Sequence, residues 1–227
     1  MKVTYFGHSS FLIEAEGKKL LFDPFITPNN LAKDINIDTI QADFILVSHA
    51  HSDHTSDLLA VAKSTGATVI SVFEIISWLE SHGVDKVHPM NIGGKWKFDF
   101  GSVKMVAATH SSSFPDGTYG GLAAGFLLEI GGKTIYYAGD TSLTQDMKLI
   151  GELYKLDLAF LPIGDNFTMG IEDAIICTRF INCKNIIGMH YDTFGYIKID
   201  HEEAARRFEE EGLELRLLEI GKSAELF

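Results

Sequence analysis

The chain has 227 residues, and its 46% hydrophobic and 22% charged content is typical of a globular protein. Its 19 Lys and Arg against 31 Asp and Glu give a net charge of −12, which repels nucleic acid and anionic membranes. No run of Lys or Arg reverses this field, and there is neither a signal-peptide pattern nor an apolar stretch of roughly 18 residues. We therefore expect a cytoplasmic protein that acts on a small molecule, without nucleic-acid or membrane partners, and leave a homo-oligomer open.

Short apolar segments bounded by turn residues predict a strand-rich first half. Gly17 and Lys18 separate two of these segments and indicate a hairpin turn. The expected strands cover residues 2–6, 10–15, 18–23, 44–49, 67–71, 95–100 and 103–109. The expected helices cover residues 56–64 and 74–83.

The second half alternates strands and helices in the same style. Strands are expected over residues 123–130, 133–140, 157–164, 185–190, 213–219 and 223–227. Helices are expected over residues 143–154, 171–181 and 201–212. Its two cysteines, Cys177 and Cys183, lie too close in sequence to frame a protein of this size with disulfides, so we expect two small buried hydrophobic residues.

A short internal similarity links the two halves. The segment FLIEAEGK (Phe11 to Lys18) aligns without gaps to FLLEIGGK (Phe126 to Lys133), and each leads into an apolar strand that ends near an aspartate, Asp23 or Asp140. Similar hairpins can look alike by coincidence, and a duplicated β-rich half followed by helices is the alternative. Two such halves packed sheet to sheet predict a four-layer α/β/β/α sandwich. No linker divides the chain, so residues 1–227 are expected to form a single domain.

The segment His49-Ala50-His51-Ser52-Asp53-His54 is the strongest chemical signal. It follows a predicted buried strand and precedes a helix, in a loop region where α/β folds place their sites. Residues two apart in extended chain project to the same side, so His49 and His51 can hold one ion. Asp53 and His54 come where the chain turns into the helix and can reach a second ion. Imidazole nitrogen and carboxylate oxygen suit zinc, manganese or iron.

The pattern HAHSDH resembles the H-x-H-x-D-H signature of the metallo-β-lactamase superfamily. In that superfamily a lone His, then an Asp and then a final His follow, each at a strand end; here these are His110, Asp140 and His190. The resemblance covers nearly the whole chain and implies the four-layer fold. In detail, GHSSFLIE, AGDTS, LPIGDNFTMG and MHYDTF resemble small uncharacterised metal-dependent hydrolases related to the ascorbate-6-phosphate lactonases.

The resemblance implies a site for two divalent metal ions, with zinc as the first expectation and manganese or iron as alternatives. The implied ligands are His49, His51 and His110 for the first ion, and Asp53, His54 and His190 for the second. Asp140 would bridge the two, and Asp53, His54 and Asp140 would be catalytic residues. Such ions can lower the pKa of a bound water to about 7, so that hydroxide serves as the nucleophile.

Several residues near these motifs are weaker candidates. His8 is either an outer hydrogen-bonding partner of the metal ligands or a turn histidine. Asp165, Asn166, Tyr191 and Thr193 lie on loops at the same strand ends and are candidate pocket residues. The Gly- and Ser-rich segment 111–121 is either a substrate loop or a long connector. No role is expected for the three remaining histidines, His82, His88 and His201.

The leading functional hypothesis is a hydrolase that uses metal-bound hydroxide on a small ester, lactone or amide. A phosphodiesterase or nuclease on the same fold is the alternative, and the absence of any basic cluster disfavours it. A di-iron redox protein would require a further flavin-binding domain, and a non-catalytic metal-binding module would not require a complete ligand set. Fold alone cannot choose the substrate.

Overall fold

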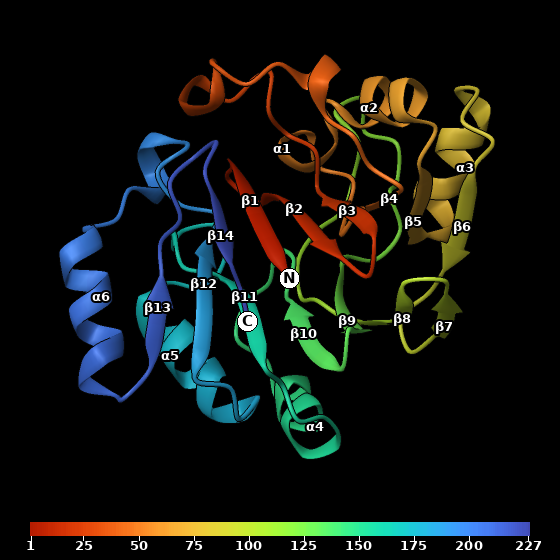
Figure 1. Cartoon of the computed structure of the whole chain (residues 1–227). Coiled ribbons are helices and arrows are strands. Elements are labelled where there is room, and N and C mark those ends of the chain that lie inside the picture. Colours follow the sequence, from red (N-terminus) through yellow and green to blue (C-terminus); the bar gives the residue numbers. More distant parts are fainter.

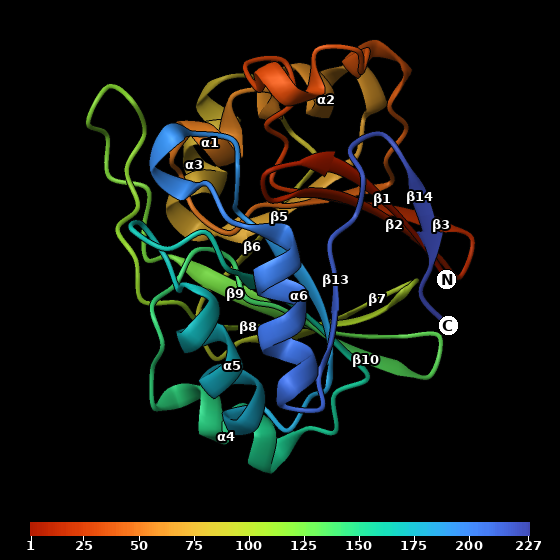
Figure 2. The same ribbon diagram turned by 90° about the vertical axis from the view of Figure 1, so that its left-hand side faces the viewer.

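The structure, a computed structural model, describes all residues 1–227 and consists of two seven-stranded sheets packed face to face. Helices α1 to α3 cover the outer face of one sheet, and α4 to α6 cover the outer face of the other (Figures 1 and 2). The molecule is therefore a four-layer α/β/β/α sandwich, which confirms the predicted architecture. No helix is both long enough and apolar enough to span a membrane.

The first sheet has the strand order β14-β1-β2-β3-β4-β5-β6. Its strands are β1 (Lys2–Gly7), β2 (Ser10–Ala15), β3 (Lys18–Phe22), β4 (Phe44–Leu46), β5 (Thr68–Val72), β6 (Val87–Met90) and β14 (Ser223–Glu225). Strands β14 to β3 pair antiparallel, and β3 to β6 pair parallel. The two ends of the chain therefore lie side by side on β1 and β14 (Figure 1).

The second sheet has the order β13-β12-β11-β10-β9-β8-β7. Its strands are β7 (Lys95–Phe98), β8 (Gly101–Ala107), β9 (Ala124–Ile130), β10 (Lys133–Tyr137), β11 (Leu158–Pro162), β12 (Asn185–Met189) and β13 (Glu214–Arg216). Strands β7 to β10 pair antiparallel, and β10 to β13 pair parallel. This sheet repeats the antiparallel-then-parallel plan of the first.

The six helices connect the parallel strands on the outside of the sandwich. They are α1 (Ser52–Thr55), α2 (Leu58–Thr65), α3 (Phe73–Ser81), α4 (Asp146–Leu153), α5 (Ile171–Phe180) and α6 (His201–Glu210). Three short 3₁₀ helices complete the chain: η1 (Asn30–Ala32), η2 (Ile37–Thr39) and η3 (Gly195–Ile197). Asp200 caps α6 by accepting a hydrogen bond from the backbone N–H of Glu203, which satisfies one of the free donors of the first turn.

The similar segments of the two halves occupy matching positions. Residues 11–18 form the β2–β3 hairpin and residues 126–133 form the β9–β10 hairpin, and each hairpin leads into the parallel part of its sheet. After each hairpin the chain continues through strand–helix–strand units, with α2 and α3 on one side and α5 and α6 on the other. The two halves thus share a hairpin followed by parallel strands, but they differ where α4 joins β10 to β11 and no α-helix lies between β3 and β4.

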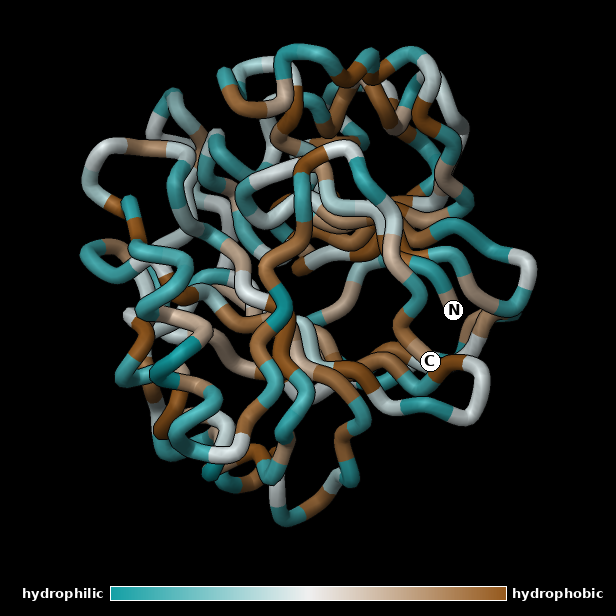
Figure 3. Tube along the Cα trace, turned by 60° about the vertical axis from the view of Figure 1, so that its left-hand side comes forward, coloured by the Kyte–Doolittle hydropathy of each residue, from teal (hydrophilic) through white to brown (hydrophobic).

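The core lies between the sheets because both inner faces are apolar. β9 and β11 are buried almost throughout, as expected for central strands covered on both faces. One hydrophobic cluster of 61 buried residues runs through the sandwich, and the hydrophobic segments concentrate on the central strands (Figure 3). Cys177 and Cys183 are buried free thiols, which confirms that they serve as small hydrophobic residues.

The sequence did not indicate every element. Strand β6 contains Pro89 and shows no apolar alternation, yet it pairs with β5 at the edge of its sheet, where a missing N–H donor is tolerated. The strand predicted over residues 44–49 is shorter than expected, because β4 ends at Leu46 and the chain then leaves the sheet while Val47, Ser48 and His49 stay buried. That early end begins the candidate site.

Candidate metal centre

The candidate residues gather at one end of the sandwich because their strands run in the same direction. β1, β3 and β4 point one way in the first sheet, and β8, β10 and β12 do so in the second, as their pairing partners require. The residues that follow these strands are His8, Asp23 and His49 in one sheet, and His110, Asp140 and His190 in the other. Ligand sites in α/β folds form at such carboxyl ends.

Residues 49–54 form a compact turn after β4. His49 is fully buried, and His51 is the N-cap of α1, with extended backbone angles of −60° and 150°. In the single turn of α1, the side chains of Asp53 and His54 point in different directions. The Asp53 side chain is 21% exposed, whereas that of His54 is buried. Thr55 holds the turn by donating its hydroxyl to the carbonyl of His51 at 2.9 Å.

The seven predicted ligands all lie together. Three groups have ligand atoms within 4.8 Å of one another. They are His49, His51 and His110; His49, His54 and Asp140; and His8, Asp53, His54 and His190. The first group equals the set expected for one ion, and the third contains the set expected for the other plus His8. The second group shares His49 with the first and His54 with the third, so Asp140 is the residue that lies between the two expected sets.

Asp140 is the electrostatic centre of the cluster. Its Oδ2 lies 2.9 Å from Nε2 of His190, 3.3 Å from that of His54 and 3.6 Å from that of His110. Burial alone would raise the pKa of this carboxyl, but His190 and His54 outweigh burial and hold the pKa well below its usual range. Conversely, burial lowers the pKa of His190, and Asp140 overrides it and raises the pKa to about 9. Asp140 is therefore an anion surrounded by imidazoles.

The cluster fits a metal better than it fits a hydrogen-bond network. Nε2 of His54 and Oδ1 of Asp140 are buried without any hydrogen-bond partner. An unpaired buried polar atom costs about 1–3 kcal/mol, and a lone pair aimed at a cation removes that cost. Burial, followed by repulsion from His54, also depresses the pKa of His49, so this imidazole is neutral and free to ligate. The donor set of imidazoles and carboxylates suits zinc, manganese or iron.

Asp23 is a further candidate residue of the site that the sequence motifs did not include. It has positive φ after β3, is fully buried, and accepts hydrogen bonds from the Ser48 N–H at 2.7 Å and the Ser48 hydroxyl at 2.6 Å. Its Oδ2 also lies 2.9 Å from Nδ1 of His54 and 2.7 Å from the hydroxyl of Tyr137 in the opposite sheet. Asp23 thus links both sheets to a ligand imidazole, and its own strand-end position, matched to Asp140, was the available signal.

These contacts fix how two imidazoles face the centre. When Nδ1 of His54 donates to Asp23, its Nε2 carries the lone pair that points toward Asp140. Nδ1 of His49 lies 3.0 Å from the Ser48 hydroxyl, which itself donates to Asp23. One carboxylate therefore orients two ligand side chains, a common arrangement around metal-binding histidines.

His8 lies inside the cluster rather than at its margin. Its Nε2 is 3.2 Å from Oδ2 of Asp53, and its Nδ1 is 2.9 Å from the hydroxyl of Thr193. Burial, followed by repulsion from His190, lowers the pKa of His8 to about 3, so the ring is neutral. The geometry matches the outer hydrogen-bonding role, one of the two roles considered for this residue, with the ring holding the Asp53 carboxylate.

The backbone is strained at three of these positions. His8, Asp23 and His190 have φ values of 56°, 41° and 58°, in the left-handed region that non-glycine residues seldom adopt. The strand ends also hold one another, since the N–H of His190 donates to the carbonyl of His8 at 2.9 Å. Such conformations persist where the surroundings impose them and cluster at functional sites.

The metal cluster forms the floor of a cavity of about 910 Å³. Of the four predicted pocket residues, only Thr193 lines it, because Asp165 faces a different hollow, Asn166 is not among its walls and Tyr191 is buried in the core. The walls include side chains that the sequence did not single out: Phe25, Pro28, Ser56, Phe167, Phe194 and Tyr196. Ser56 follows α1, and the other five come from the loops after β3, β11 and β12.

The loop over residues 111–121 contributes little to this cavity. Only Ser111 faces it, with its hydroxyl 3.2 Å from Nε2 of His51. Phe114 is buried and stacks on Trp78 of α3 with ring centroids 4.2 Å apart. The middle of this loop is therefore anchored on the helical layer, as a connector would be.

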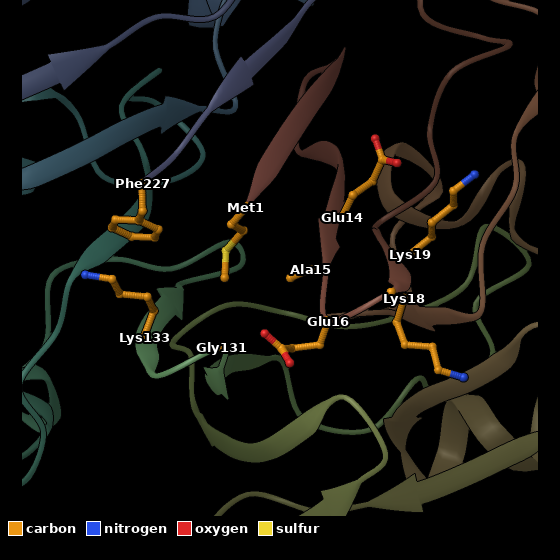
Figure 4. A pocket seen from close by; sticks show the side chains of 10 residues that line it. Met1, Glu14, Ala15, Glu16, Lys18, Lys19, Gly131, Lys133 and Phe227 are labelled. Atoms are coloured by element: carbon orange, nitrogen blue, oxygen red, sulfur yellow. The ribbon is translucent and has the colours of Figure 1, made fainter.

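A second hollow, of about 580 Å³, lies beside the two chain ends (Figure 4). Met1, Glu16, Lys133 and Phe227 line it, and Nζ of Lys133 lies 4.5 Å from the centroid of the Phe227 ring. It contains no histidine and none of the candidate residues. The cavity above the cluster of His and Asp residues is therefore the candidate site.

Comparison with known proteins agrees with this arrangement. The sequence model of the family described as "Beta-lactamase superfamily domain" matches residues 2–190, which include every candidate ligand. The chain belongs to the metallo-β-lactamase superfamily. Its fold is the metallo-β-lactamase fold, and the fold class expected from the sequence is confirmed.

Within this superfamily, the chain also belongs to a family of close relatives. It is 57% identical over 226 residues to a UPF0173 metal-dependent hydrolase of Flavobacterium johnsoniae, with all of both chains covered. It is 48% identical over 222 residues to a relative of the same name in Thermus thermophilus, covering 98% of this chain and 97% of that one. This metallo-β-lactamase-fold protein is therefore a metal-dependent hydrolase.

A solved structure supports the same conclusion. Igni18, described as a novel metallo hydrolase from the archaeon Ignicoccus hospitalis, is 37% identical, with a TM-score of 0.89. The match covers 98% of this chain and 97% of that one, so the two share the whole fold rather than one layer of it.

Proposed function

We propose that this metal-dependent hydrolase holds two divalent metal ions and cleaves a small ester, lactone or amide. His49, His51 and His110 would hold one ion, Asp53, His54 and His190 the other, and Asp140 would lie between them. The single observation that carries the proposal is that two candidate ligand groups are joined by a third, which consists of His49, His54 and Asp140. When bound, two such ions supply a water ionised near neutral pH as the nucleophile and polarise the bond to be cleaved.

The protein's own residues prepare this chemistry. Asp23 and Ser48 fix the orientations of His54 and His49, so the ligand nitrogens need no rearrangement. Asp53 lies at the boundary between cluster and cavity, with its carboxylate held by His8. From that position the Asp53 carboxylate can accept a hydrogen bond from the attacking water and orient it toward the substrate.

The depth of the cluster favours small substrates. His49, His54, Asp140 and His190 are at most 1% exposed, so only a molecule that enters the cavity reaches the reacting position. A cavity of about 910 Å³ is of the size that encloses a small organic molecule. Neither Ser nor Cys is required as a nucleophile, and both thiols are buried in the core and do not line the cavity.

Metal analysis of the protein, followed by a substrate panel, tests the proposal. We expect two ions per chain after saturation with zinc, and hydrolysis of at least one ester, lactone or amide that stops when the ions are removed. The panel includes bis(4-nitrophenyl) phosphate, because a phosphodiesterase is the alternative on this fold. Saturation at one ion, with no change on His190→Ala, would refute the binuclear site. Cleavage of the phosphodiester alone would replace the proposed substrate class.

A further inference from the structure

The mouth of the metal cavity is lined by an aromatic wall, consisting of Phe25, Phe167, Phe194 and Tyr196. The rings come from three separate loops, yet they pair: Phe167 and Tyr196 meet edge to face with centroids 6.2 Å apart, and Phe25 and Phe194 lie 6.3 Å apart. Phe167 is 49% exposed and Tyr196 is 79% exposed. Exposed apolar rings that gather at a cavity, rather than singly over the surface, mark a binding surface.

The loops that carry this wall are held in place. The carboxylate of Asp57 accepts hydrogen bonds from the N–H groups of Ile26 and Thr27 at 2.6 and 2.8 Å, which fixes the loop next to Phe25. Asp192 does the same for the loop of Phe194 and Tyr196, accepting from the N–H of Ile199 at 3.1 Å. These contacts hold the loops of Phe25, Phe194 and Tyr196 in place, which reduces the ordering cost of binding a ligand against those rings.

No lysine or arginine lines the cavity. Apart from the metal ligands, its polar groups are uncharged hydroxyls, and the protein as a whole carries a net charge of −12. An ionised group resting on the aromatic wall would lose water without gaining a cationic partner, which is costly. A phosphate held away from the metal cluster, as on a sugar phosphate, would have no cation to bind it.

We infer that the substrate is an uncharged ester, lactone or amide whose aryl or bulky apolar portion lies against the aromatic wall. This inference rests on the proposed function and adds the substrate class. In the productive arrangement the acyl carbon lies at the metal cluster. Attack by water forms the new acyl C–O bond, the bond to the leaving alcohol or amine breaks, and that group departs with a proton.

A matched substrate pair tests the inference on the zinc-loaded protein. Benzyl acetate and its ring 4-sulfonate release alcohols of similar acidity and differ mainly in the remote charge. We expect kcat/KM to be at least about 10-fold higher for the uncharged ester. Phe167→Ala and Tyr196→Ala should lower that preference mainly by raising KM, and Tyr196→Arg should raise kcat/KM for the sulfonate. Trp96→Ala, which removes an exposed ring from β7, is the control and should change neither value.

A binding measurement separates this inference from the proposed function. Saturation-transfer NMR should detect benzyl alcohol on the zinc-loaded protein, with weaker signals for its 4-sulfonate and for both alanine variants. If no ester is cleaved but this binding pattern holds, the proposed hydrolysis fails, while the preference of the aromatic wall for an uncharged aromatic ligand stands. If esters are cleaved and the sulfonate is bound and cleaved as well as its uncharged partner, the aromatic-wall inference is wrong and the hydrolase proposal survives.

Discussion

Oδ2 of Asp23 lies 2.9 Å from Nδ1 of His54, and both side chains are fully buried. Burial alone would lower the pKa of His54, but the carboxylates of Asp140 and Asp23 on either side of the ring raise it well above its usual range. A ring between two carboxylates holds whichever cation is available, a proton or a metal ion. Asp23 therefore sets the orientation of a central ligand without facing the cavity itself.

Asp23→Asn should weaken metal binding by roughly 10–100-fold, as loss of an outer partner of a metal ligand typically does. The amide keeps the shape but has only one acceptor oxygen, so the donors Ser48, His54 and Tyr137 cannot all be satisfied. Zinc titration against a fluorescent chelator measures the effect. Asp157→Asn, at a carboxylate that accepts the Thr134 N–H far from the cluster, is the matched control. Equal affinities for the two variants would contradict the role of Asp23.

His8 should act by positioning the Asp53 carboxylate. In His8→Asn, the amide keeps a hydrogen-bond donor near Asp53, and asparagine tolerates the positive φ of this position. Alanine has no side-chain donor and tolerates positive φ less well. We expect a loss of roughly 10–100-fold in metal affinity for His8→Ala and partial recovery for His8→Asn. Isothermal titration with zinc measures both, and circular dichroism checks that the fold persists. Unchanged affinity in His8→Ala would leave His8 as a turn residue of the strand end.

The ligand cluster could be predicted because its residues carry a spacing and an order. The spacing of the residues in the motif at 49–54 can be recognised in the sequence alone. His110, Asp140 and His190 follow predicted strands in the expected order. These strands run in the same direction, so their carboxyl ends, and the candidate ligands that follow them, meet at one edge of the sandwich. Periodicity likewise located nearly every strand and long helix, since both inner sheet faces must be apolar.

Residues outside such patterns could not be predicted in the same way. Asp23 follows an ordinary apolar strand, and its importance depends on contacts with Ser48, His54 and Tyr137 that are distant in sequence. The aromatic wall lies on loops without periodicity, so sequence does not tell which rings face the cavity. Phe167 lies two residues after Asp165, and both Asp165 and Asn166 have positive φ; the Phe167 ring reaches the cavity, whereas the Asp165 carboxylate does not.

The two cysteines should be inert at neutral pH. Burial raises the pKa of Cys183 to about 11, and it raises that of Cys177 still further. Because only the thiolate reacts, iodoacetamide at pH 7.5 should modify neither residue in the folded protein over the time in which a small thiol reacts fully. Mass spectrometry measures the modification. Cys177→Ser and Cys183→Ser should keep nearly the full rate per folded molecule, and rapid alkylation accompanied by loss of activity would contradict this.

Substitutions of Asp140 and of Asp53 should reduce activity for different reasons. Asp140 is buried among four imidazoles, so Asp140→Ala removes the anion that balances the cluster and should lose at least one ion and nearly all turnover. Asp53 lines the cavity, and Asp53→Asn keeps its shape while removing its charge. We expect this variant to fold normally, with a thermal midpoint close to that of the unchanged protein, and to hydrolyse an active ester at least about 100-fold more slowly.

A pH–rate profile on an active ester or lactone, with and without chelator, completes this test. The rate should rise with pH through the ionisation of the attacking water, near pH 7 if the ions resemble known hydrolytic zinc centres. The sign follows from the nucleophile, because only deprotonated water attacks and its fraction grows with pH until ionisation is complete. Metal content measured on the same samples separates loss of ions in Asp140→Ala from loss of charge in Asp53→Asn. Activity that survives both metal removal and Asp140→Ala, yet disappears in a cysteine variant, would overturn the mechanism.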